Sequence, residues 1–327
     1  MKTIVKLLRK PIAASILAIA VGFLIAAIVL AIAGYAPGPS FAALFNGMIG
    51  KPKYISNVVI KATPLILTGT AVAFAFKTGL FNIGAEGQYV TGTICAAIVG
   101  ISCDFPPVLQ VPLVILAGTA GAGLGALVGW LKARFGISEV ITSIMFNWIS
   151  LYACNFVVNV PAFHQPESTS TYAVNPSSYT MILPKWKLSE EGLATLKGTP
   201  WLYEVLVKTD VNVGILIAVA CAILIAVLLK RTKMGYEMRA VGLNREAAQF
   251  AGINVNRNIV TCMLISGALC GLAGALAVTG LEPHNISTLA AFENNGFNGL
   301  SVAFIAGSSP IGCIFAGFLF SGLIYGG

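Results

Sequence analysis

Charged side chains are scarce in this sequence. Asp, Glu, Lys and Arg together make up 10% of the 327 residues, whereas 57% of the residues are hydrophobic. Soluble domains carry roughly 25% charged residues, which keep their surfaces hydrated. The composition therefore excludes an ordinary soluble protein and predicts one that is surrounded by lipid.

Residues that perform metal and acid–base chemistry are scarce as well. The chain has two His residues, and its seven Cys residues are scattered without a C-x-x-C pair, so neither a metal site nor a redox pair is predicted. A Walker A phosphate loop is missing, since Pro52 follows Gly50-Lys51 and no Gly lies at the required upstream position. We therefore expect a non-enzymatic chain that binds no cofactor itself. If ATP and Mg²⁺ drive it, another chain must bind them.

The net charge of +8 does not indicate a nucleic-acid partner. Lys and Arg lie at the ends of apolar runs and in a few loops, and they form no basic face interleaved with aromatic residues. The positive charge instead reports how the chain is threaded through a membrane.

Long apolar runs recur along the chain, several of them near the ~20 residues that cross a bilayer as a helix. The first run, Ile12–Ala33, exceeds the ~7 to 15 residues of a signal-peptide core, which favours an uncleaved helix over a cleaved leader. A last apolar stretch starts at Phe297 and is interrupted at Gly307–Pro310. The runs between them are Val58–Phe76, Ile83–Ile101, Val111–Leu131, Val140–Val160, Val213–Leu229 and Ile259–Gly280. We predict an all-α fold, a single transmembrane helical bundle over residues 1–327 with about 8 to 10 membrane segments.

The distribution of Lys and Arg predicts one orientation. With a cytoplasmic N-terminus, the inside segments hold Lys2, Lys6, Arg9, Lys10, Lys77, Lys132, Arg134, Lys230, Arg231, Lys233, Arg239, Arg245 and Arg257. The largest outside loop, residues 161–210, balances four Lys against five acids, and the last outside loop has Glu282 and Glu293 with no Lys or Arg. By the positive-inside rule, 161–210 is expected to be extracytoplasmic and 231–257 cytoplasmic.

Glycines spaced for close helix packing form two stripes. Gly121, Gly125 and Gly129 form one, and Gly267, Gly271 and Gly274 form the other. In lipid, small residues let helix backbones approach closely, so both stripes predict helix-to-helix faces. The alternative is that Gly is simply common in membrane helices.

The cytoplasmic segment 231–257 contains a predicted short helix. Asn244 is a suitable N-cap for a helix over Arg245–Ala251, and Gly252 is a suitable stop. This helix would lie across the inner face of the protein. It is either a connector or a contact for a partner.

Polar residues interrupt the apolar pattern in the segment Phe81–Gln88, which reads F-N-I-G-A-E-G-Q. Asn82 is a possible cap at a helix start, and Glu86 and Gln88 follow within the next turns. An ionisable residue in a membrane helix is expensive unless it is paired or faces water, so Glu86 is a candidate functional residue. Alternatively, Glu86 complements a helix N-terminus or bonds a neighbouring helix.

Further polar and aromatic residues lie in the run that starts at Val140. Asn147, Trp148, Asn155 and Asn159 are within it, with Asn155 and Asn159 on one helix face. They either line a pathway or bond between helices. The candidate substrate-pathway residues are Phe81, Asn82, Glu86, Gln88, Asn147, Trp148 and Asn155.

Three motifs resemble those of ABC-transporter permeases. Glu246-Ala247-Ala248, followed by Gly252, is similar to the EAA loop that docks onto the ATPase subunit, although the usual Ile-x-Leu-Pro tail is absent. F-N-I-G-A-E-G-Q closely resembles a motif of the nucleoside-type permeases within the branched-chain amino acid, simple sugar and nucleoside group. The block Gly296–Gly307 is similar to the family's final membrane block.

The resemblance implies the permease subunit of an ATP-driven importer, most similar to those for nucleosides. Simple sugars and branched-chain amino acids are the alternative substrates, and an ion-coupled carrier with Glu86 as its ion site is the competing class. The implied partners are cytoplasmic ATPase subunits, a second permease chain, homologous or identical, and an extracytoplasmic substrate-binding protein, in a bacterial plasma (inner) membrane. The implied ATPase-coupling residues are Arg239, Gly242, Asn244, Glu246, Ala247, Ala248 and Gly252.

Overall fold

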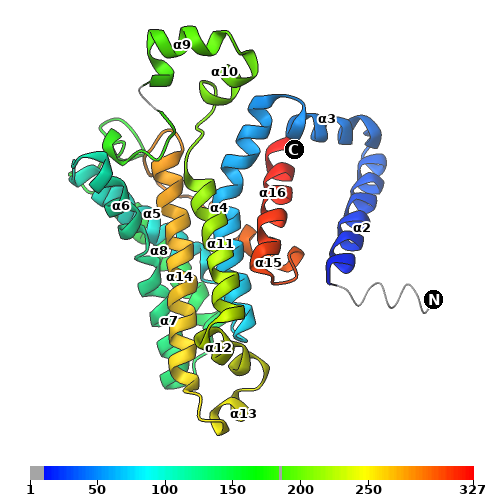
Figure 1. The fold of residues 1–327 in the computed structure, drawn as a ribbon, viewed down its shortest axis with the longest axis vertical. Helices are drawn as coiled ribbons and strands as arrows, with labels where there is room; N and C mark the ends of the chain where they lie inside the picture. Colours follow the sequence, from blue (N-terminus) through cyan, green and yellow to red (C-terminus); the bar gives the residue numbers. More distant parts are fainter. Residues whose placement is uncertain (1–10, 184–185) are drawn as a thin grey trace.

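The described part of the protein, residues 11–183 and 186–327 of a computed structural model, is a bundle of helices without a named strand (Figure 1). The first half contains α2 (Pro11–Ile32), α3 (Pro37–Ile49), α4 (Pro52–Lys77), α5 (Ala85–Ser102), α6 (Pro107–Gly118), α7 (Gly121–Phe135) and α8 (Glu139–Val158). The second half contains α9 (Glu190–Lys197), α10 (Pro200–Leu206), α11 (Gly214–Arg231), α12 (Lys233–Leu243), α13 (Arg245–Phe250), α14 (Val255–Gly280), α15 (Asn295–Ile305) and α16 (Pro310–Gly326). The predicted all-α class is confirmed.

The number of membrane spans is lower than the sequence suggested. Six helical stretches in the described residues are long and apolar enough to cross a membrane, or seven if α15 and α16 count as one broken span. The prediction of about 8 to 10 membrane segments is therefore wrong, because the count is too high. The run at Ile83–Ile101 corresponds to α5, which is not among the six because Glu86 and Gln88 make its first turns polar.

One predicted break in the apolar runs is confirmed, and the structure has a second break that was not predicted. The interruption at Gly307–Pro310 is real, since α15 and α16 meet there at an angle of 118°. The run Val111–Leu131 was expected to be continuous, but it is divided into α6 and α7 at Thr119–Ala120. Pro310 begins α16, where its missing N–H costs no intrahelical hydrogen bond.

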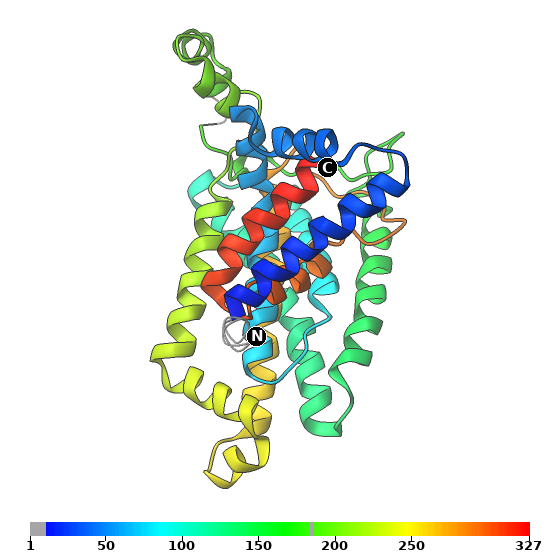
Figure 2. The same ribbon diagram turned by 90° about the vertical axis from the view of Figure 1, so that its right-hand side faces the viewer.

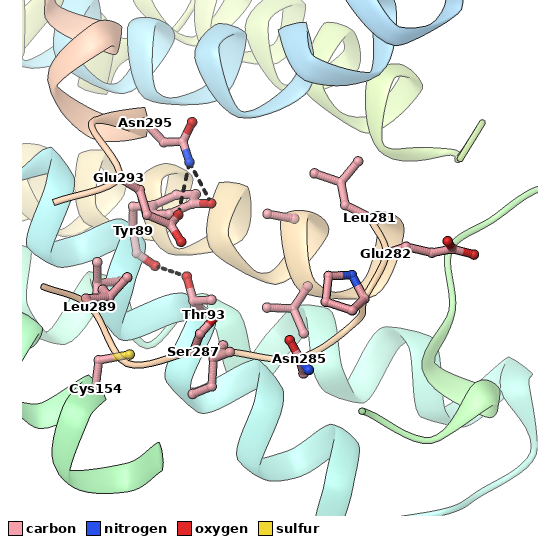
Figure 3. A pocket seen from close by; sticks show the side chains of 15 residues that line it. Tyr89, Thr93, Cys154, Leu281, Glu282, Asn285, Ser287, Leu289, Glu293 and Asn295 are labelled. Atoms are coloured by element: carbon pink, nitrogen blue, oxygen red, sulfur yellow. Dashed lines mark hydrogen bonds between the residues drawn. The ribbon is translucent and has the colours of Figure 1, made fainter. Parts of the chain in front are cut away.

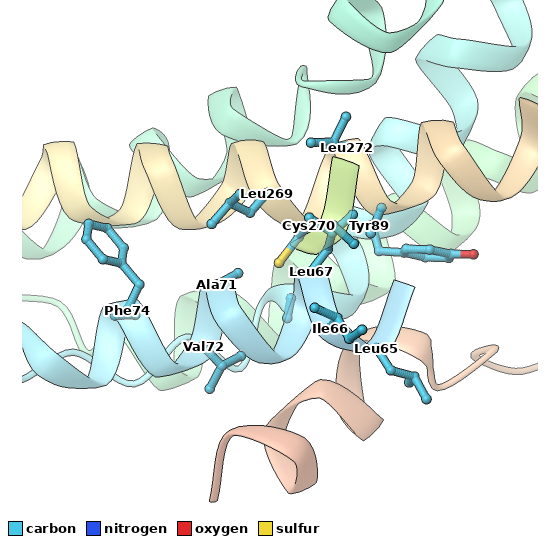
Figure 4. Close-up of a cluster of buried hydrophobic side chains, with 14 of the residues drawn as sticks. Leu65, Ile66, Leu67, Ala71, Val72, Phe74, Tyr89, Leu269, Cys270 and Leu272 are labelled. Carbon is cyan, nitrogen blue, oxygen red and sulfur yellow. The ribbon is translucent and has the colours of Figure 1, made fainter. Parts of the chain in front are cut away.

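The two large connecting segments lie at opposite ends of the bundle. Figure 1 shows α9 and α10 at one end, here called the α9 end, and α12 and α13 at the other, the α13 end. Between these ends, α4 and α14 run side by side through the centre. Their most apolar stretches are 83% and 72% buried, more than those of any other candidate span in the described residues. In Figure 4 the side chains of α4, among them Leu67, Ala71 and Phe74, meet Leu269 and Cys270 of α14.

The predicted glycine stripes are confirmed as helix-to-helix faces. A Cβ on Gly125 of α7 would lie 2.1 Å from the Met263 carbonyl oxygen of α14, and one on Gly271 would lie 2.2 Å from the Gly118 carbonyl oxygen. Gly274 instead faces α5, where a Cβ would lie 2.3 Å from the Tyr89 carbonyl oxygen. Helix α14 is thus clamped between α7 and α5 at distances that only glycine permits.

Helix α2 is the least integrated part of the described bundle. Figure 2 shows it crossing the face of the molecule on the side of α16. None of its most apolar stretch is buried against the rest of the chain, and exposed side chains such as Leu24 and Val29 lie on several sides. A helix that is apolar all round belongs in lipid or against another membrane helix.

We predict that Gly125→Ala lowers the free energy of unfolding by about 1–3 kcal/mol, because the new methyl group overpacks the contact between α7 and α14. Gly123 is the matched control on the same helix, since a Cβ there meets nothing within 4 Å. Gly123→Ala should leave stability unchanged or slightly higher. Thermal unfolding of the purified protein in detergent measures both, and equal Tm values for the two variants would contradict the packing assignment.

Candidate functional site

The chain turns back into the bundle after α14 ends. Residues 281–294, here called the re-entrant segment, leave the α9 end and run along α5 and α8 to the start of α15. Glu293 was expected in an outside loop, but the next residue, Asn294, hydrogen-bonds to Glu86 in the first turn of α5. At ~1.5 Å per residue, Glu86 lies roughly 24 Å along α5 from Ser102. Non-helical backbone at such depth is tolerated only where protein covers it or where it lines a water-filled cavity.

The Glu86 carboxylate caps the N-terminus of α15 from a neighbouring helix. One oxygen accepts a hydrogen bond from the backbone N–H of Asn294 at 2.9 Å, and the other accepts from Gly296 at 2.6 Å and Phe297 at 3.2 Å. The N-cap residue Asn294 has φ +65° and makes no side-chain cap of its own. Glu86 is completely buried, and the three N–H groups together with the helix dipole offset the cost of burying its charge.

Close approach at this contact depends on Gly296. A Cβ there would lie 2.3 Å from the backbone nitrogen of Glu86. Any larger residue at Gly296 would force α15 away from α5 and lengthen the bonds to the carboxylate.

Three more predicted pathway residues hold the start of α5. The Asn82 amide donates to Gln88 and to Ser266 of α14, both at 2.8 Å. Asn147 of α8 accepts from the Gly87 N–H at 2.8 Å and donates to the Ile83 carbonyl at 3.1 Å. All of these polar side chains are buried. Asn147 was expected either to line a pathway or to bond between helices. These contacts are bonds from α8 to the start of α5.

Asn155 fixes the middle of the re-entrant segment. Its amide donates to the Leu289 carbonyl at 3.0 Å and accepts from the Leu289 N–H at 2.7 Å. Nearer the α9 end, the segment pairs with the 161–210 loop through three backbone bonds: Thr171 N–H to Ile286 O, Val174 N–H to His284 O and Thr288 N–H to Thr169 O. The segment is therefore held at three levels, by the loop, by Asn155 and by Glu86.

The two aromatic candidates, Phe81 and Trp148, lie apart from each other. Phe81 packs against Phe76 and Phe304, with ring centroids 6.0 and 6.1 Å away. Trp148 packs edge-on against Phe292 of the re-entrant segment at 4.8 Å and is 46% exposed. Among the ring contacts of the described residues, that of Trp148 with Phe292 reaches the re-entrant segment, whereas those of Phe81 are with α4 and α15.

A cavity of about 180 Å³ lies between α5, the end of α14 and the re-entrant segment (Figure 3). Tyr89, Glu293 and Asn295 gather at one end of it, where the Asn295 amide donates to the Tyr89 hydroxyl at 3.0 Å and to the Glu293 carboxylate at 3.2 Å. None of these three residues was predicted from the sequence to belong to a site. Tyr89 follows Glu86 by nearly one helical turn, so the face of α5 carrying Glu86 was the available indication.

The α13 end carries the segment expected to contact a partner. Asn244 caps α13 by accepting from the Ala247 N–H at 3.0 Å, and Gly252 has φ +81°, as predicted for cap and stop. The helix ends at Phe250, one residue before the expected end. Of the EAA residues, Ala248 is buried, whereas Glu246 and Ala247 are exposed.

Helices α12 and α13 contact the turn between α4 and α5 directly. A Cβ on Gly242 would lie 2.3 Å from the Lys77 carbonyl oxygen, and Arg245 donates to the Gly79 carbonyl at 3.1 Å. Gly79 itself has φ +71°, which requires glycine at this turn. Arg239 stays within its own helix, where it donates to Gly235. The α13 end therefore contacts the turn between α4 and α5, and this turn leads directly to Asn82 and Glu86.

We predict that Glu86→Gln destabilises the protein by about 1–3 kcal/mol, because the amide nitrogen faces N–H donors where a carboxylate oxygen accepted from them. Glu293→Gln is the matched control, since no backbone N–H bond to its carboxylate occurs among the described contacts. Thermal unfolding in detergent compares the two. A Glu86→Gln Tm equal to that of Glu293→Gln would show that the cap contributes nothing.

Comparison with known proteins places the chain among transporter subunits. The guanosine ABC transporter permease protein NupP of Bacillus subtilis (strain 168) is 37% identical over 313 residues, covering 95% of this chain and 84% of the relative. The nucleoside ABC transporter permease protein NupB of Lactococcus lactis subsp. cremoris (strain MG1363) is 35% identical over 308 residues, covering 94% and 81%. The glucose ABC transporter permease protein TsgB13 of Haloferax volcanii is 28% identical over 298 residues, covering 89% and 73%.

No solved structure matches the chain significantly. The model of the family described as branched-chain amino acid transport system / permease component matches residues 54–324. This range runs from the first turn of α4 to the last turn of α16 and contains every candidate site residue. The chain therefore belongs to this family of ABC-transporter permease components.

Proposed function

We propose that this chain is the membrane subunit of an ATP-driven nucleoside importer. Two relatives more than a third identical are named as guanosine and nucleoside permeases. The motif at Phe81–Gln88, which resembles the nucleoside-type version, forms the contact between α5 and α15. The sequence motif and the named relatives thus favour the same substrate class.

The observation that most strongly supports coupling to an ATPase is the apolar surface of the α13 end. Phe250 is 96% exposed and Leu243 is 89% exposed, on two short helices that project from the bundle. Large apolar side chains on a projecting surface indicate a protein partner. In this proposal the α13 end is cytoplasmic, as the Lys and Arg distribution predicts, and the partner is an ATPase subunit that binds ATP and Mg²⁺.

The contacts between Gly242, Arg245 and Gly79 offer a path for movement. An ATPase that shifts α12 and α13 pushes on the turn after α4, because Gly242 touches its backbone. That turn leads into Asn82 and then to Glu86, which caps the start of α15. Residues Arg239, Asn244, Glu246, Ala247, Ala248 and Gly252 serve this coupling by shaping or presenting α12 and α13.

The remaining partners follow from the same proposal. A second permease chain, homologous or identical, covers the exposed membrane face, and an extracytoplasmic binding protein docks on the 161–210 loop. The backbone bonds from this loop to Ile286 and His284 connect that docking surface with the re-entrant segment. The assembly belongs in a bacterial plasma (inner) membrane.

An ion-coupled carrier using Glu86 as its ion site is disfavoured by the geometry. Both oxygens of Glu86 already accept backbone hydrogen bonds, and the residue is fully buried. A proton or cation binding there would have to break the cap of α15. A sugar permease is the second candidate, because TsgB13 is named for glucose.

We predict that Phe250→Ser abolishes association with the ATPase subunits while leaving the fold intact, because the side chain makes no buried contact. Phe304→Ser at the packed aromatic cluster is the contrasting variant, which should lower the Tm. Co-purification of tagged ATPase with each permease variant measures association. Retention of the ATPase and of uptake in Phe250→Ser would refute the coupling role.

We predict that cells lacking this chain lose uptake of labelled nucleosides, relative to cells with the complete transporter. Uptake of ribose and leucine should be the same in both. ATP depletion should abolish the uptake, and collapse of the proton gradient should not. Loss confined to ribose or leucine would keep the ABC class and reject nucleosides. Loss that follows the proton gradient would favour the carrier.

A further inference from the structure

We propose that the cavity beside Glu293 is a substrate subsite, and that the Glu293 carboxylate accepts hydrogen bonds from two adjacent donors on the substrate. The inference deepens the nucleoside-importer proposal and rests on it. The cavity is the one bounded by α5, the end of α14 and the re-entrant segment (Figure 3).

Glu293 is a charged group without a charged partner. Ion pairs among the described residues join Lys132 to Glu139, Lys208 to Glu204 and Lys233 to Glu237, and none includes Glu293. The residue is exposed although it lies next to Asn294, which bonds to the buried Glu86. A carboxylate facing lipid there is costly, so this face must border water, a polar ligand or another chain.

Glu293 keeps part of its hydrogen-bonding capacity. Among the described residues, the Asn295 amide donates to it at 3.2 Å and the Tyr89 hydroxyl is its other hydrogen-bonding neighbour. A carboxylate accepts at two oxygens and at about four lone-pair positions, so it can receive a bidentate pair from one ligand. The contrast with Glu86, whose oxygens accept from three backbone N–H groups, identifies Glu293 as the available acceptor.

The rest of the cavity suits a neutral molecule with both polar and apolar edges. Apolar side chains make up much of the lining, with Thr93, Asn285 and Ser287 among them as uncharged polar groups. Such a mixture, apolar walls with a few convergent polar groups, is typical of small-molecule sites. Lys and Arg are absent from the lining, so a phosphorylated substrate would meet only the negative charge of Glu293 and Glu282.

The volume limits how much of the substrate enters. About 180 Å³ is below the ~300–1,000 Å³ of pockets that enclose a drug-sized ligand. The cavity therefore takes one ring of a nucleoside, and the other ring lies outside it. Adjacent donors occur on either ring, as the 2′,3′-diol of ribose or as the neighbouring N–H groups of a guanine-type base.

The test is uptake kinetics of the complete transporter carrying Glu293→Gln. Gln keeps the shape but replaces one acceptor oxygen with a donor, so we expect the KM for guanosine to rise at least tenfold with an unchanged Tm. Asp104→Asn removes the same charge from an exposed residue at the α9 end that does not line the cavity. It should keep the wild-type KM.

Substrate analogues identify which donors bind. If the diol binds, the KM of the wild-type transporter for 2′,3′-dideoxyguanosine should be as high as the KM of Glu293→Gln for guanosine. Glu293→Gln should then have the same KM for both nucleosides. If the base binds, the same pattern should appear with inosine, which lacks the 2-amino group. Guanosine 5′-monophosphate should not compete in either case.

Two results would overturn the subsite. One is that Glu293→Gln has the same KM as the wild-type transporter for every nucleoside tested. The other is failure of the second permease chain to co-purify with this variant, which would assign Glu293 to a contact between the two permease chains. Absence of nucleoside uptake by the wild-type transporter would instead reject the proposed function, so the two failures are distinguishable.

Discussion

The capping of α15 by Glu86 is the interaction on which the rest of this membrane domain depends. A helix that begins inside a bilayer leaves backbone N–H groups without water to bond them. Here three of these groups donate to one carboxylate on a different helix, and their hydrogen bonds offset part of the cost of burying that carboxylate. The two groups need each other, since either alone would be an unsatisfied polar group in an apolar setting.

That mutual dependence explains the polar residues around the start of α5. A cap works only at hydrogen-bonding distance, so the first turn of α5 must be fixed in position. Asn147 holds the Gly87 N–H, and Asn82 links Gln88 with Ser266 of α14. Gly296 then allows the two backbones to meet. The turn before Asn82 packs against the backbone of Gly242. This contact connects the segment that carries the Glu86 cap with the α13 end.

The sequence was sufficient for the features that depend on local pattern. Apolar runs predicted the helices, glycine spacing predicted the faces of α7 and α14, and Asn244 with Gly252 predicted the limits of α13 within one residue. It was insufficient where a contact joins distant residues. Glu86 and Asn294 are 208 positions apart, and the re-entrant segment has the polarity of an ordinary outside loop. Its depth is set by its partners, Asn155 and Glu86, and not by its own composition.

The two carboxylates near the start of α15 differ in burial and in hydrogen bonding. Glu86 is buried, and both of its carboxylate oxygens accept hydrogen bonds from backbone N–H groups. Its charge therefore stabilises the fold. Glu293 lies one residue before the capped turn, yet it is exposed, and its hydrogen-bonding neighbours among the described residues are the Asn295 amide and the Tyr89 hydroxyl. Because unsatisfied charge is tolerated at this depth only beside water or a polar partner, the second carboxylate cannot be explained by folding. A transporter that moves neutral, hydrogen-bonding substrates supplies the reason for keeping it there.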